Sequence, residues 1–202
     1  ANDTFLHGEK VWREALLAAY QTNLNDYPHL EEAINILQQW DGYATKDSVG
    51  MTLFREWWRQ LKEQPQVLKE AREHPFDLSQ NAQKAFLDSL AKAVEQLNQW
   101  FGCVAVPWEQ VYRARRGDES WSVSGVAGLE FTTLRLVNSP EPDANGMCWV
   151  ESGQVCTTIV MLEKNNVKSY SVVPFGQSEY TESPHYTDQG RLLFSEDKFK
   201  DT

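Results

Sequence analysis

The sequence predicts an α+β protein, with a helical N-terminal segment at residues 1–105 and antiparallel strands at residues 106–202. Two observations support this fold class. Before residue 105, apolar residues recur every three to four positions, which is the spacing of an amphipathic helix. After Pro107 the apolar period changes to two, in short runs rich in Val, Ile, Thr and aromatic residues. Because helices and strands occupy separate parts of the chain, α+β is favoured over a doubly wound parallel sheet.

The first segment is expected to contain four helices. Two lie at residues 5–20 and 30–40, a third is capped by Ser48 and ended by Pro65, and a fourth runs from about 78 to 100. Their aromatic residues share faces with Leu and Val at helical spacing. These residues are therefore expected to form the core between helices and not a ligand site.

The second segment is expected to contain short strands, at 120–123, 131–137, 147–150, 155–162 and 167–173. Turn signals separate them, including those at 152–153 and 165–166. The basic run at 113–116 is interpreted as a solvated turn. Short strands leave open edges and the end of the chain is polar, so we expect an incomplete unit whose tail lies against another surface.

Composition and charge exclude several functional classes. The 202 residues are 41 % hydrophobic and 24 % charged, which is typical of a folded globular protein. The net charge of -10 repels phosphate backbones and anionic lipids, so neither nucleic acid nor a membrane is expected as a partner. No apolar run approaches the ~20 residues of a membrane helix, and the polar N-terminus shows no signal peptide. No cofactor is expected, and no CxxC or HxxxH spacing indicates a metal site.

Ser183, His185 and Asp188 are the residue types of a Ser-His-Asp hydrolase, close together in the sequence. A catalytic triad needs these groups to converge from different elements, whereas groups within one short extended stretch usually point apart. Pro184 instead predicts a rigid turn, because it fixes its own φ and restricts Ser183 to extended geometry. His185 is therefore expected to be at least half buried and hydrogen-bonded, and not to line an open pocket beside a serine. An independent enzyme that uses His185 is the alternative.

Cys148 and Cys156 are candidates for a disulfide. If Val150 and Gln154 flank a tight turn, the two cysteines face each other across a hairpin, where opposite Cα atoms lie ~4.5–5.5 Å apart. The alternative is two small apolar residues on one strand face.

Four motifs occur in order along nearly the whole chain. The first two are W-D-G with D-S-x-G-x-x-L-F-x-x-W at 40–57, and R-G-D-x-x-x-x-V-S-G at 116–125. The third begins with S-G-Q and spans 152–162, and the fourth is a tail motif at 176–189. The members of the tail motif are Gly176, Gln177, Ser178, Ser183, Pro184, His185, Tyr186, Asp188 and Gln189. Together these motifs resemble the penicillin acylase (penicillin amidase) family, and the tail is similar to its acyl-homoserine-lactone and aculeacin acylase branch.

The resemblance implies an N-terminal-nucleophile hydrolase with an αββα core, made as a precursor that cuts itself into α and β chains. The first serine of the β chain attacks the amide, and its own α-amine, with an ordinary pKa of about 7.7–8.0, acts as the base. This sequence begins with Ala1 and matches only the later part of a β chain. We therefore expect a C-terminal β-chain fragment that holds no catalytic residue and is inactive alone, and we interpret the tail motif as structural.

The resemblance also implies partners and a substrate. The partners would be the α chain and the N-terminal part of the β chain of the same acylase. The substrate would be an N-acylated small molecule such as an N-acyl-homoserine lactone, an acylated lipopeptide or a penicillin. Family membership implies export to the periplasm or the medium. The alternative is a non-catalytic scaffold or binding module with the same fold.

Overall fold

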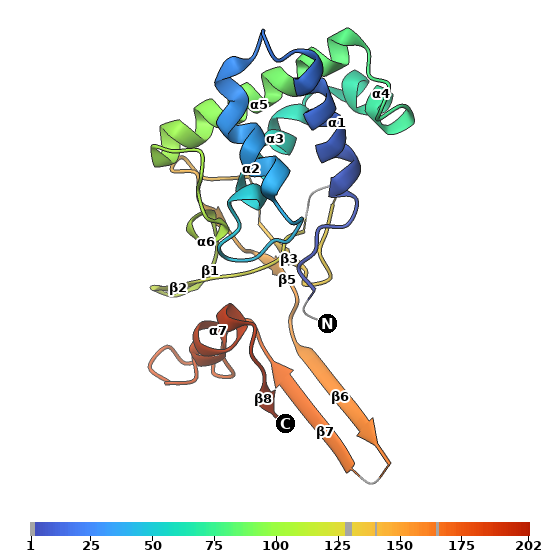
Figure 1. Ribbon diagram of the computed structural model, residues 1–202. Helices are drawn as coiled ribbons and strands as arrows, with labels where there is room; N and C mark the ends of the chain where they lie inside the picture. Colours follow the sequence, from blue (N-terminus) through green and yellow to red (C-terminus); the bar gives the residue numbers. More distant parts are fainter. Residues whose placement is uncertain (1–2, 128–130, 140, 165) are drawn as a thin grey trace. The chain divides into compact units, whose positions relative to one another are not determined.

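The computed structural model describes residues 3–127, 131–139, 141–164 and 166–202 and has the expected α+β architecture (Figure 1). The chain forms two compact units. The helical unit comprises residues 6–43 and 47–108, and the strand unit comprises 1–5, 44–46 and 109–202. The assignment of residues 1–5 and 44–46 to the strand unit was not expected, because long-range hydrogen bonds cause it. Ala44 N–H donates to Thr4 O (2.8 Å), and Gly125 N–H donates to Ala44 O (2.8 Å).

The helical unit contains all four expected helices and two further elements. The elements are α1 (Glu9–Thr22), η1 (Pro28–Leu30), α2 (Glu31–Gln39), α3 (Val49–Leu61), α4 (Pro65–Glu73) and α5 (Gln80–Phe101). Pro65 does not only end a helix: it begins α4, because a proline at the first helical position loses no hydrogen bond and has a suitable φ. A short helix, α6 (Trp108–Val111), follows in the chain.

The aromatic residues of the helical unit form its core, as expected. Phe54 and Trp57 of α3 are fully buried, and their ring centroids lie 5.4 Å apart. The Trp57 ring packs edge-on against Phe86 of α5 at 5.4 Å, and Trp57 Nε1–H donates to Phe86 O at 3.0 Å. This hydrogen bond satisfies the polar atom of a buried indole, so the residue joins α3 to α5 without an unpaired donor.

The described residues of the strand unit form three small sheets, with strand orders β2-β1-β4, β3-β5 and β6-β7-β8 (Figure 1). The strands are β1 (Tyr112–Arg116), β2 (Glu119–Ser122), β3 (Val137–Asn138), β4 (Cys148–Trp149), β5 (Ser152–Gly153), β6 (Thr157–Glu163), β7 (Asn166–Val172) and β8 (Lys200–Asp201). All pair antiparallel except β1 and β4, which are parallel. The expectation of antiparallel strands alone is therefore wrong at this position.

Two turn assignments in the strand unit are wrong. The basic run at 113–116 lies in β1, where Ala114 is buried, the three arginines are not, and all four residues pair in register with β2. Ser152 and Gly153 form β5 and pair with β3, because a Gly at φ 138 allows an approach to Leu136 O that a Cβ would block at 2.4 Å. Asn165, in another expected turn, lies outside the described residues.

The expected Cys148–Cys156 disulfide is not formed. Cys148 is buried in β4 beside β1, whereas Cys156 is exposed before β6, and no disulfide joins them. The tight hairpin that would have placed them opposite each other does not exist, because the intervening residues 152–153 pair with β3. The second reading fits Cys148, which behaves as a small buried apolar residue.

The tail is folded within the strand unit. It contains α7 (Asp188–Leu192) and η2 (Phe194–Glu196), and β8 extends the sheet that β6 and β7 begin (Figure 1). Phe194 is 2 % exposed and anchors this part of the chain. Much of the tail therefore packs against its own unit. This packing was not expected from the sequence, because the tail is mostly polar and Phe194 is one of its few apolar residues.

Candidate functional site

The tail motif forms a closed loop stabilised by backbone hydrogen bonds. Ser178 N–H donates to His185 O at 3.1 Å, and Tyr186 N–H donates to Ser183 O at 3.0 Å. Gly176 permits this closure, because a Cβ there would lie 2.0 Å from His185 O. The glycine of the motif is thus explained by a close approach of two backbone segments.

His185 is exposed, so the expectation that it is at least half buried is wrong. Its side chain has 69 % relative exposure, and Nδ1 lies 2.9 Å from Asp188 Oδ2. The expected hydrogen bond to a polar side chain is present, but backbone hydrogen bonds, such as that from Ser178 N–H to His185 O, close the loop. The imidazole therefore lies on the outside of a turn that its main chain closes.

Ser183 does not complete a triad with this pair. Its Oγ accepts a hydrogen bond from the His185 backbone N–H at 3.2 Å, as in a serine turn. In a triad the hydroxyl would contact the imidazole nitrogen opposite the carboxylate. The structure brings the three residues near one another, but it joins the serine to the main chain and the carboxylate to the ring.

The other members of the motif attach the loop to the strand unit. Tyr186 stacks on the Arg116 guanidinium at 4.1 Å and accepts a hydrogen bond from Arg116 Nη1 at its carbonyl oxygen (2.7 Å). Gln189 is 5 % exposed, and its Oε1 accepts from Val173 N–H at 3.3 Å. Gln177 Oε1 accepts from Lys200 Nζ of β8 at 3.1 Å. These contacts connect the tail motif with the R-G-D motif, since Arg116 belongs to the latter.

The W-D-G motif of the helical unit is also built for packing. Trp40 lies directly over Gly50, where a Cβ would approach Trp40 Cγ to 2.2 Å. Trp40 Nε1–H donates to Tyr43 O at 2.9 Å, and its ring lies 5.3 Å from that of Phe54. Ser48 caps α3 by accepting from Met51 N–H at 3.1 Å. The motif therefore encodes the turn into α3 and the packing of its first residues.

A buried arginine was missed by sequence reasoning. Arg135 is fully buried, forms an ion pair with Asp197, donates to Phe194 O and lies 4.0 Å from the Phe194 ring. Burial lowers the pKa of Arg135 to about 10, so it remains charged at neutral pH. Asp197 has φ 55, a left-handed conformation that places its carboxylate beside this cation. Nothing in the local sequence around Arg135 indicated a partner so far along the chain.

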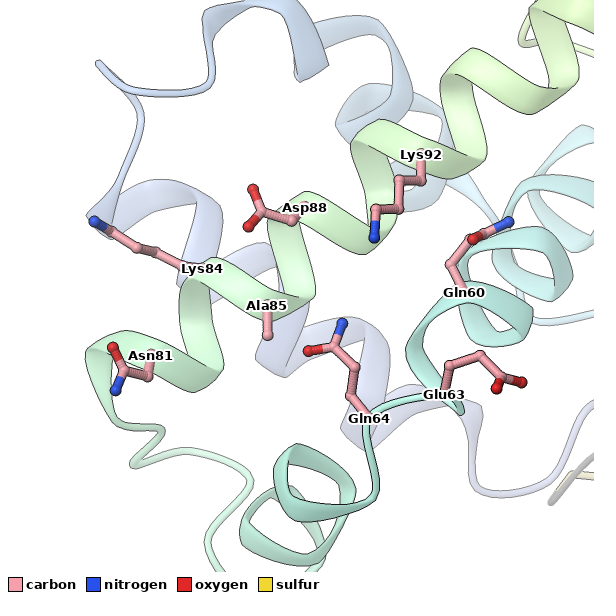
Figure 2. Close-up of a pocket in the computed structure, with 8 residues that line it drawn as sticks. All are labelled: Gln60, Glu63, Gln64, Asn81, Lys84, Ala85, Asp88 and Lys92. Carbon is pink, nitrogen blue, oxygen red and sulfur yellow. The ribbon is translucent and has the colours of Figure 1, made fainter.

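The helical unit has a polar pocket of about 480 Å³ along α5, lined by Gln, Asn, Lys and acidic side chains (Figure 2). Figure 2 shows Lys84, Asp88 and Lys92 on α5 and Gln60, Glu63 and Gln64 across the pocket. Asp88 accepts a hydrogen bond from the Tyr27 hydroxyl at 2.8 Å, and burial together with this carboxylate raises the pKa of Tyr27 to about 12. The lining contains no serine, cysteine or histidine.

Two further features bear on function. In the described ranges there is no group of three or more His, Cys, Asp or Glu side chains arranged to hold a metal ion. Across the same residues, no helix has both the length and the apolar character needed to cross a membrane.

Comparison with protein families gives one match that covers almost all of the chain. Residues 2–200 match the family model described as Penicillin amidase. The match includes both units and all four motifs described above.

Proposed function

The chain belongs to the penicillin amidase family of N-terminal-nucleophile hydrolases, and we propose that it is the C-terminal part of an acylase β chain. The family implies amide hydrolysis in the intact protein. The finer proposal is that this part supports the fold, while the nucleophilic serine and the oxyanion donors lie in the rest of the protein.

The arrangement of Ser183 carries this proposal. Its hydroxyl accepts from a backbone N–H in a turn, and the neighbouring imidazole is exposed on the outside of that turn. The residues that most resemble catalytic machinery thus have structural contacts. Ala1 lies outside the described residues, so the proposal rests on the loop and not on the chain terminus.

The β6–β7 hairpin supports the proposed partner, which is the remainder of the same acylase. Leu162 is 80 % exposed, Val167 64 % and Val160 53 %, although all three are apolar strand residues. In the described sheet β6 pairs with β7 alone, so its other edge is open. An open, apolar edge favours pairing with another strand, and strands from the rest of the protein would cover it.

The substrate would be an N-acylated small molecule, with N-acyl-homoserine lactones, acylated lipopeptides and penicillins as the candidates. The tail motif, similar to the acyl-homoserine-lactone and aculeacin branch, supports the first two. In the mature enzyme the α-amine of the first β-chain residue would take the proton of its own hydroxyl, since its ordinary pKa is near neutral. Localisation in the periplasm or the medium is part of the proposal.

Hydrolysis of short- and long-chain acyl anilides tests the proposed function. The intact gene product should release the chromogenic amine, and purified residues 1–202 should not. In the intact product, His185→Ala should leave turnover near normal, because the exposed imidazole contacts Asp188 and the proposed nucleophile is a serine elsewhere in the protein.

Two outcomes would contradict this proposal. Turnover by residues 1–202 that disappears with His185→Ala would establish an independent enzyme, which the 2.9 Å His185–Asp188 contact makes the second candidate. An intact product without turnover on any acyl anilide would favour the non-catalytic scaffold.

A further inference from the structure

We propose that a groove between α1 and α2 binds a short, extended, basic peptide segment of a partner protein. The groove lies wholly within the helical unit and has a volume of about 540 Å³. This volume is in the range of drug-sized ligands, about 300–1,000 Å³, so it suits a segment of about four residues and not a folded domain. The inference does not require the proposed hydrolase activity.

The floor of the groove is apolar. Its two buried lining residues are Tyr20 of α1, which is 4 % exposed, and Ile34 of α2, which is 3 % exposed. Leu24 and Pro28, which lie between the two helices in the chain, add further apolar surface, and Leu24 is 47 % exposed. Covering exposed apolar surface is favourable, so the groove can accept apolar side chains of a ligand.

Side-chain amides supply most of the polar groups of the groove. Gln21 and Asn25 come from the end of α1 and the turn after it. Asn35 and Gln38 come from α2. All four are exposed, and none makes a side-chain hydrogen bond to another residue that the structure describes. Each carboxamide has N–H donors and a carbonyl acceptor, which complement the C=O and N–H groups of a peptide backbone.

An extended backbone fits these amides better than a helical one. In an extended segment the N–H and C=O groups point sideways, while successive side chains point to opposite faces. The backbone can therefore pair with amides from both α1 and α2 while every second side chain meets the apolar floor. A helical peptide bonds its own N–H and C=O groups internally, so it would leave the four amides unused.

The charges of this region favour a basic ligand. Glu31 is the charged residue of the described lining. Residues 14–45 contain five acidic side chains and no lysine or arginine. A surface of one sign attracts ligands of the opposite sign, so cationic side chains are favoured at the rim of the groove. A nucleic acid would be repelled, and Tyr20, the aromatic residue of the lining, is too buried to stack on a base.

The test is fluorescence anisotropy of the intact gene product at low salt, with the fluorescein-labelled peptide Val-Lys-Val-Lys-amide. We expect saturable binding of this peptide and none of Val-Glu-Val-Glu-amide. Methylation of both valine nitrogens keeps the charge but removes two backbone N–H donors. The methylated peptide should bind at least about fivefold more weakly, which corresponds to the loss of one hydrogen bond.

Two pairs of exposed residues on α2 provide matched variants. Glu31→Gln and Glu32→Gln remove the same charge from neighbouring positions, but only Glu31 lines the groove. Glu31→Gln should weaken binding about threefold, and Glu32→Gln should weaken it less. Asn35→Ala should weaken binding about fivefold, because it removes an amide of the groove. Gln39→Ala, outside the lining, should leave binding unchanged.

Several results would overturn the proposal. They are no saturable binding of the basic peptide, equal affinity for its methylated form, or equal losses within either pair of variants. Displacement of the peptide by an equal concentration of cadaverine, which has two ammonium groups but no peptide bond, would show that charge alone is recognised. The comparison of methylated and unmethylated peptides uses the unmodified protein, so it remains decisive if a variant fails to fold.

Discussion

Glu9 shows how a single buried carboxylate affects the helical unit. It begins α1 with 1 % exposure, and its Oε2 lies 2.9 Å from Arg13 Nε. Burial raises the pKa of Glu9 above its ordinary value of 4.5, although Arg13 opposes the shift. The neutral acid is therefore the form that the folded state favours. Its contribution to stability is fully present below pH 4.5 and is lost as the pH rises through the folded-state pKa.

We predict that Glu9→Gln gains stability relative to the unmodified chain as the pH rises from 4 to 7. The amide cannot ionise, so it avoids the cost of a buried charge, and Arg13 keeps its hydrogen bond to Leu37 O. Urea unfolding at both pH values measures the difference. Glu14→Gln is the control, because Glu14 is 47 % exposed on the same helix and its replacement should show little pH dependence. A relative loss of stability for Glu9→Gln at pH 7 would mean that the Arg13 pair outweighs burial.

At the scale of elements, α3 depends on its first turn. Ser48 has extended φ and ψ, and its hydroxyl accepts from Met51 N–H, which has no partner within the helix. The next positions pack under Trp40, so the start of α3 is fixed by a cap and a close contact together.

Ser48→Ala should destabilise the chain by about 1 kcal/mol, because it leaves the Met51 N–H without its acceptor. Tryptophan fluorescence during urea unfolding reports this loss, since Trp57 lies in α3. Ser48→Thr keeps the hydroxyl and should retain most of the stability. Equal destabilisation by both replacements would show that the size of the side chain matters and not the cap.

At the scale of the whole molecule, the net charge of -10 dominates long-range electrostatics. Like charges repel one another in the compact state, and salt screens this repulsion over about 10 Å at 0.1 M. Exposed ion pairs such as Lys168–Glu163, at 3.3 Å, contribute little and are screened as well. The balance therefore favours the folded state as salt increases.

We predict that raising NaCl from 0.02 to 0.3 M increases Tm, measured by circular dichroism. The matched variant Glu179→Gln/Glu182→Gln removes two charges from exposed positions of the tail and should show a smaller increase. If salt lowers Tm in both proteins, attractive ion pairs outweigh the net repulsion.

The local parts of the fold could be predicted from the sequence because their causes are local. Helical periodicity predicted the four main helices, and Ser48 predicted the N-terminal cap of α3. Runs rich in β-branched residues predicted β6 and β7. The tail motif was correctly interpreted as a turn, since Pro184 restricts the chain whatever surrounds it. Burial was not predictable in the same way: His185 is exposed because its backbone, and not its ring, makes the contacts that close the loop.

By itself the sequence determined the α+β class, the four main helices, the Ser48 cap of α3 and the family motifs, all of which depend on neighbours a few residues apart. Tertiary structure alone decided the parallel pairing of β1 with β4, the role of Ser152 and Gly153 as a strand, and the Arg135–Asp197 pair. These contacts join residues far apart in the chain, and no local preference encodes them, because their free energy appears only when distant segments pack and exclude water.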